Sequence, residues 1–90
     1  MNSATVSAAQ EKPFALSLLD DLSVADNPLT FDDLFNRLKS HIATEDSEMA
    51  RDVLALLQRD HYVVQQPDGK YLFRFPLIQR CWRLHRGLGR

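Results

Sequence analysis

The sequence predicts one α+β domain in which three helices precede a two-stranded hairpin and a fourth helix follows it. Apolar residues recur at helical spacing in three segments between residues 14 and 57. Two short β-branched and aromatic runs then flank a Pro-Asp-Gly-Lys turn, and a proline opens the last amphipathic segment. At 90 residues, with 44% hydrophobic and 26% charged residues, the chain suits a single core of this kind.

The first predicted helix covers residues 14–22, and Pro13 suits its first turn because proline has no backbone N–H to satisfy there. Residues 1–11 are small and polar, so we expect a flexible tail before a domain that spans residues 12–90. The apolar residues with the i, i+3, i+4, i+7 spacing of one helix face are Ala15, Leu18, Leu19 and Leu22.

The second and third helices are predicted to begin at capping residues. Thr30, with Asp33 three residues later, resembles a capping box and predicts a helix that starts at Phe31. Thr44 is the expected cap of the third helix, with acidic residues in its first turn. The expected inward residues are Phe31, Leu34, Phe35, Leu38 and Ile42 in the second helix and Ala50, Val53, Leu54 and Leu57 in the third.

The hairpin is predicted from residues 62–66 and 71–75, around a loop at residues 67–70 in which Gly69 can take a positive φ. The short segment Pro28-Leu29-Thr30 could add a third, minimal strand. Four unpaired loop residues would make one face of the hairpin apolar and pack it on the helices. The expected cross-strand pairs are Gln66 with Tyr71, Val64 with Phe73, and Tyr62 with Phe75.

The last helix is predicted to start at Pro76, which stops the second strand. Its apolar side is expected to cover the core, and its basic side is expected to face solvent. The residues expected on the core side are Leu77, Ile78, Cys81, Trp82 and His85, and those on the opposite side are Gln79, Arg83, Arg86 and Arg90.

This order of elements is that of a winged helix-turn-helix, in which the hairpin is the wing. The stretch from Pro28 to Trp82 resembles winged-helix domains in order and spacing, with Asp68-Gly69-Lys70-Tyr71 at the wing tip. Such domains often have Gly where this chain has His61, and His can take the left-handed conformation at some cost.

A narrower resemblance concerns the strand-to-helix junction Tyr71-Leu72-Phe73-Arg74-Phe75-Pro76-Leu77 and the Trp/Arg-rich segment after it. It is similar to the C-terminal winged helix of bacterial STAND-type and archaeal-type AAA-like ATPases. The resemblance implies the non-catalytic end of an ATPase. The chain itself has only three glycines and no G-x-x-x-x-G-K-[ST] motif, so it lacks the loop that cradles nucleotide phosphates.

The net charge of −1 conceals an uneven layout, because residues 1–69 carry five positive and twelve negative charges and residues 70–90 carry six and none. The third helix would read a DNA groove, yet it is rich in acids that a phosphate backbone repels. Its expected outward residues are Ser47, Glu48, Arg51, Asp52 and Arg59. The residues expected to bind a protein surface or phosphate are Lys70, Arg74, Arg80, Arg83, Arg86 and Arg90.

We therefore expect a non-catalytic, regulatory interaction module whose partner is another protein or its own parent ATPase domain, with DNA binding through the wing and C-terminal basic residues as the alternative. No enzyme activity, cofactor or metal is expected. Cys81 and His85 have the i, i+4 spacing of metal ligands, but the periodicity explains both as core neighbours of Trp82. Asp20 and Asp21 are adjacent on a helix and diverge by about 100°, so they do not form an acid–base pair.

The composition also favours a cytoplasmic protein that does not enter a membrane. A single cysteine cannot form an intramolecular disulfide, and small secreted domains usually contain several. No apolar run approaches the roughly 18 residues of a membrane span, and the first ten residues lack the pattern of a signal peptide. The oligomeric state stays open at this point.

Overall fold

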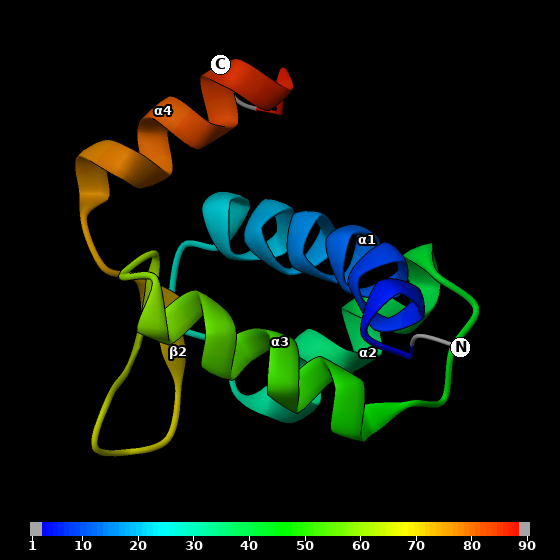
Figure 1. Ribbon diagram of the computed structural model, residues 1–90. Coiled ribbons are helices and arrows are strands. Elements are labelled where there is room, and N and C mark those ends of the chain that lie inside the picture. Colours follow the sequence, from blue (N-terminus) through cyan, green and yellow to red (C-terminus); the bar gives the residue numbers. More distant parts are fainter. Residues whose placement is uncertain (1–2, 89–90) are drawn as a thin grey trace.

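The computed structural model describes residues 3–88 and has helix α1 as its central element. The elements in order are α1 (Ser3–Val24), α2 (Phe31–His41), α3 (Ser47–Arg59), β1 (Val63–Gln65), β2 (Tyr71–Phe73) and α4 (Pro76–Arg86). Figure 1 shows α4 on one side of α1, with α2 and α3 on the other. The predicted α+β class is confirmed, with three helices before a two-stranded antiparallel hairpin in the sequence and one helix after it.

Helix α1 begins at Ser3, so Pro13 lies inside it rather than in its first turn. The predicted start at Pro13 is therefore wrong, and the segment expected to be a tail is helical from Ser3 onward. This segment is rich in alanine, the residue with the highest helix propensity, which favours continuation of the helix despite the hydrogen bond that Pro13 removes. Residues 1 and 2 lie outside the described residues.

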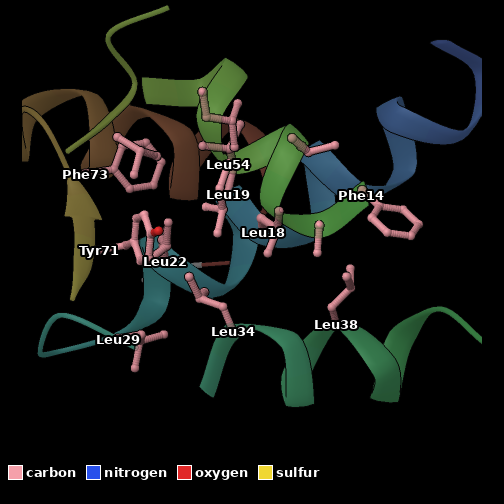
Figure 2. Close-up of a cluster of buried hydrophobic side chains, with 14 residues drawn as sticks. Phe14, Leu18, Leu19, Leu22, Leu29, Leu34, Leu38, Leu54, Tyr71 and Phe73 are labelled. Atoms are coloured by element: carbon pink, nitrogen blue, oxygen red, sulfur yellow. The ribbon is translucent and has the colours of Figure 1, made fainter. Parts of the chain in front are cut away.

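The core is built around α1, as Figure 2 shows. Leu18 and Leu22 of α1 lie against Leu34 of α2, Leu54 of α3 and Phe73 of β2 in one buried cluster. The predicted inward residues of α3 are all buried, and those of α2 are buried or packed on the cluster. The side chains that make up the core are Phe14, Leu18, Leu19, Leu22, Leu29, Leu34, Leu38, Ala50, Val53, Leu54, Leu57, Val63, Tyr71 and Phe73.

The helix caps follow the sequence signals with one exception. Thr30 Oγ1 accepts a hydrogen bond from the Asp33 backbone N–H at 3.1 Å, which confirms the predicted start of α2. In α3 the cap is Asp46, whose Oδ1 accepts from the Met49 N–H at 2.9 Å. Thr44 instead accepts from the Asp46 N–H at 3.0 Å, so it stabilises the turn that leads into the helix and the predicted Thr44 cap is wrong.

The hairpin register differs by one residue from the predicted one. Val63, rather than Val64, lies opposite Phe73. The cause is the turn at Gly69, which has a φ of 91° and donates its N–H to the Gln66 carbonyl at 2.8 Å. The Gln66 N–H in turn donates to the Lys70 carbonyl at 2.8 Å, so Gln66 lies opposite Lys70 rather than Tyr71 and the loop closes over residues 67–69. A slip of one residue exchanges the two faces of a strand, and Val63 is therefore buried while Tyr62 is exposed.

Two further details agree with the sequence. Leu29 forms a single antiparallel bridge with Tyr71, through two backbone hydrogen bonds of 2.9 and 2.7 Å, where a minimal third strand was predicted. His61 has a φ of 69°, the left-handed conformation expected where the chain leaves α3. Both features fix the path of the chain between the helices and the hairpin.

Helix α4 starts at Pro76 as predicted and ends at Arg86, followed by Gly87, whose φ of 70° suits a C-terminal cap. The helix is rotated about its axis relative to the predicted orientation. Leu77 is 69% exposed and Cys81 and His85 are exposed, so the predicted core side faces outward. Of the residues expected on that side, Trp82 alone packs on the core within the described chain. Gln79 and Arg83, expected in solvent, are half-buried against the bundle.

A matched pair of leucine substitutions tests this orientation. Leu34→Ala should lower the free energy of unfolding by about 2–5 kcal/mol, because Leu34 is fully buried and its truncation leaves a cavity. Leu77→Ala should change it by less than about 0.5 kcal/mol, because the side chain is in solvent. Urea unfolding followed by circular dichroism measures both, and a comparable cost for the two variants would contradict the outward position of Leu77.

Candidate functional site

The carboxylate of Asp20, on α1, holds α4 against the bundle. Its Oδ1 accepts hydrogen bonds from Trp82 Nε1 at 2.8 Å and from Arg86 Nε at 3.0 Å. Its Oδ2 accepts from Arg86 Nη2 at 2.9 Å, so the guanidinium binds both oxygens. Charge-assisted bonds to two parallel donors are shorter and more directional than neutral ones, and they fix the rotation of α4 about its axis.

A second anchor lies at the C-terminal end of α1. Gln79 Nε2 donates to the backbone carbonyls of Leu22 and Ser23, at 3.3 and 3.0 Å. Carbonyls in the last turn of a helix have no partner within that helix, so Gln79 satisfies acceptors that would otherwise depend on water. Gln79, Trp82 and Arg86 lie at positions i, i+3 and i+7 and form one side of α4, and this side faces α1.

The pKa of Asp20 reflects these contacts. Burial alone would raise it, but the hydrogen bonds from Arg86 and Trp82, together with the positive charge of Arg86, outweigh burial and lower the pKa below the usual carboxyl value. Asp20 is therefore ionised near neutral pH and keeps its full capacity as an acceptor.

The opposite side of α4 is apolar and open to solvent. Together with Phe75, the capping residue just before the helix, this side forms the α4 apolar face, which we define as Phe75, Leu77, Ile78, Cys81 and Leu84. Leu77 is 69% exposed, Leu84 64% and Phe75 50%. Single exposed apolar residues are common on protein surfaces, but a contiguous group on one helix is typical of a binding surface. This face is the strongest candidate for a functional site among the described residues.

The predicted basic cluster is divided by this arrangement. Lys70, Arg74 and Arg80 are exposed and have no ion pair with the described side chains. The Arg74 guanidinium lies 5.2 Å from the centre of the Phe75 ring, next to the α4 apolar face. Arg83 is half-buried, and Arg86 is exposed but paired with Asp20 on the side of α4 that meets α1, so neither lies on a side turned away from the core as predicted. Arg90 lies outside the described residues.

The predicted outer surface of α3 is largely as expected, since Glu48, Asp52 and Arg59 are exposed. Arg51 is also exposed, but its guanidinium carbon lies 3.9 Å from the centre of the Phe31 ring, which engages this cation with α2. Ser47 is half-buried in the first turn. Figure 1 shows α3 and α4 on opposite sides of α1, so this surface and the α4 apolar face are separate.

Asp21, the neighbour of Asp20, contacts a different helix, in line with the divergence predicted for adjacent helix positions. It is 7% exposed, and its Oδ1 lies 3.5 Å from His41 Nε2 on α2. Its Oδ2 and Ser17 Oγ are buried without a hydrogen-bond partner among the described residues. Burial raises the pKa of Asp21, although the charges of His41 and Arg37 act against this rise. Both carboxylates border an open cavity of about 590 Å³ between α1, α2 and the end of α4.

Neither a metal-binding cluster nor a membrane-spanning helix occurs among the described residues. Within residues 3–88, no three or more His, Cys, Asp or Glu side chains are grouped so that they could hold a metal ion. Cys81 and His85 are exposed, which corrects their predicted place in the core. In the same part of the chain, no helix combines the length and the apolarity needed to cross a membrane.

Sequence reasoning missed the role of Asp20. One signal for it was present, because an acidic residue near the C-terminal end of a helix opposes the helix dipole and therefore favours a cationic partner. The other signal was the spacing of Trp82 and Arg86, two donors four residues apart on a helix. Neither signal identifies the pairing alone, since the two segments are 62 residues apart in sequence.

The described chain thus combines four helices and a two-stranded antiparallel hairpin in an α+β arrangement. A scan against models of protein families finds no match to it, and neither a search of curated proteins nor a search of solved structures returns one.

The single tryptophan provides a test of the Asp20 anchor. Asp20→Ala removes the acceptor of Trp82 Nε1 and the partner of Arg86, so α4 should loosen and expose the indole. We expect tryptophan emission to shift to longer wavelength while the unfolding of the α1–α3 core stays cooperative. Asp26→Ala, at an exposed position beyond the end of α1, is the matched control and should leave the emission unchanged.

The same anchor predicts a pH dependence of the unsubstituted protein. The folded-state pKa of Asp20 is lowered, so its ionised form contributes to the stability of the folded protein. This contribution is complete above the usual carboxyl pKa and is lost as the pH falls through the lowered value. The emission of Trp82 should therefore shift in acid, and the shift should be absent in Asp20→Ala. An identical acid shift in both proteins would contradict the assignment to Asp20.

For Asp21 we expect the opposite effect, in which ionisation of the carboxyl lowers the stability of the folded protein. Since burial raises its folded-state pKa, the ionised form costs stability, and this cost grows as the pH rises through that value. Asp21→Asn should raise the free energy of unfolding at neutral pH by about 1 kcal/mol. The gain should vanish near pH ~3, where the carboxyl is protonated in both states. Thermal unfolding at both pH values measures it, with exposed Asp26→Asn as the control that should show no gain.

Proposed function

We propose that the chain is a non-catalytic winged-helix interaction module that docks on a protein surface through the α4 apolar face. The observation that carries this proposal is the orientation of α4. Its hydrogen-bonding side is satisfied by α1, while Leu77, Cys81 and Leu84 are exposed on the other side. An amphipathic helix whose apolar side has no cover within the described chain is typical of a helix that completes its packing on a partner.

The winged-helix assignment is supported by the order and geometry of the elements. Three helices precede the hairpin, which would be the wing, and Leu29 adds a minimal strand to it. Gly69 forms the tip, and His61 ends the third helix in the left-handed conformation. In the ATPases that the junction from Tyr71 to Leu77 resembles, such a domain follows the catalytic core, and the module would then make a regulatory contact with its own parent chain.

Protein contact is favoured over DNA contact by the charges at the two surfaces. The outer side of α3 exposes Glu48 and Asp52, which a phosphate backbone would repel. Arg86, one of the cations expected to bind phosphate, is already paired with Asp20. The observation that keeps DNA binding as a second candidate is the exposure of Lys70 and Arg74, on either side of β2, and of Arg80 on α4.

The mechanism that follows is docking of a preformed surface. Asp20 and Gln79 hold α4 in place before the partner arrives, so little conformational entropy is lost on binding. Leu77 and Leu84 would supply most of the affinity by leaving water, and the neighbouring cations would select the partner by charge.

Two measurements separate protein docking from DNA binding. A photo-crosslinking amino acid in place of Leu84, in cells that produce the chain, should give discrete protein adducts that disappear when Leu77→Ser is added. The same residue in place of exposed Asp52 on α3 is the control and should give none of these adducts.

The second measurement is a titration with mixed-sequence duplex DNA at two salt concentrations. We expect no binding at low salt. Micromolar binding that falls steeply with salt and is abolished by Arg80→Ser would replace the proposed function with the DNA alternative.

A further inference from the structure

The α4 apolar face and its borders point to one kind of partner. We propose that this face binds an acidic amphipathic helix of another protein, which lies along α4 on the side opposite α1. This inference rests on the proposed function and adds the chemistry of the partner to it.

The geometry of the face fits a helix. Leu77, Cys81 and Leu84 are separated by four and three residues, which aligns them as one ridge along α4. The side that meets α1 is formed by Gln79, Trp82 and Arg86 and lies opposite this ridge. A helix packs on such a ridge at an interaxial distance of about 8–10 Å, and the eleven residues of α4 offer about 16 Å of length, or three turns.

The charges beside the ridge require acidic residues on the partner. Arg80 is exposed and adjoins Leu77 and Leu84 on one border, and Arg74 lies over the Phe75 ring at the start of the helix. His85 adjoins Cys81 on the other border. No Asp or Glu occurs anywhere from residue 70 to residue 90, so the face has no negative charge of its own. Glu or Asp on the flanks of a partner helix would complement Arg74 and Arg80, and Lys or Arg would be repelled.

The same charges disfavour a second copy of α4 as the occupant, because Arg80 would approach another basic helix. A lipid surface is disfavoured by the position of two other side chains. Interfacial helices place Trp and Arg where they reach the lipid headgroups, whereas Trp82 and Arg86 are bound to Asp20 on the opposite side of α4.

Two helical peptides test the inference directly. Both carry the same leucine ridge and a staple on the far side; one has Glu on the flanks of the ridge and the other has Lys. We expect the full chain to bind the Glu peptide with micromolar affinity in fluorescence anisotropy and the Lys peptide at least about tenfold more weakly, since opposite charges at a border are attracted and like charges repelled. Adding salt should narrow this difference.

Variants of the chain locate the binding surface. Leu84→Ser should reduce affinity for the Glu peptide by about tenfold or more, because the shorter polar side chain no longer removes apolar surface from water in the complex. Arg80→Ser should reduce affinity for the Glu peptide and leave that for the Lys peptide unchanged or higher. Arg59→Ser, an exposed arginine on α3, is the matched control and should change neither.

The outcomes distinguish this inference from the proposed function. Equal binding of both peptides would overturn the inference of an acidic partner but would still support docking through the α4 apolar face. Binding of neither peptide, together with Leu84-dependent binding to vesicles of anionic phospholipid, would overturn both. Self-association of the chain in sedimentation, lost in Leu84→Ser, would instead assign the face to a second copy and overturn the acidic helix.

Discussion

The Asp20 carboxylate determines which side of α4 meets the rest of the molecule, and the character of the surface depends on that choice. It binds Trp82 and Arg86 through three hydrogen bonds of 2.8 to 3.0 Å. The side chains left outside include Leu77 and Leu84, each of which would gain roughly 1.5–3 kcal/mol on full burial. The domain therefore exposes an apolar surface that a binding partner can bury.

Much of the fold was predictable because its determinants are local. The cap at Thr30 involves residues within one helical turn, and the inward side of α3 follows from the spacing of Ala50, Val53, Leu54 and Leu57 alone. The hairpin was located correctly, but its register was not, because the positive φ of Gly69 lets Gln66 pair with Lys70 rather than with Tyr71. A sequence pattern does not determine the length of a loop to within one residue.

The orientation of α4 could not be derived in this way. Its apolar side has a clear helical period, and periodicity alone assigns that side to the core. The opposite outcome depends on pairing with a carboxylate 62 residues earlier in the chain, which no local pattern contains. For the candidate site, the exposure of Lys70, Arg74 and Arg80 was predicted, whereas the internal use of Arg86 and the exposure of Leu77 and Leu84 required the structure.

Cys81 allows the most direct measurement of this orientation, because it is the single cysteine of the chain and lies on the α4 apolar face. The rate of its reaction with an aromatic disulfide reagent reports whether the thiol is accessible in the folded protein. The orientation described predicts a rate in native buffer close to that of the chain unfolded in urea. A thiol that reacts only when the protein unfolds would place the apolar side of α4 in the core and contradict both the Asp20 anchor and the docking surface.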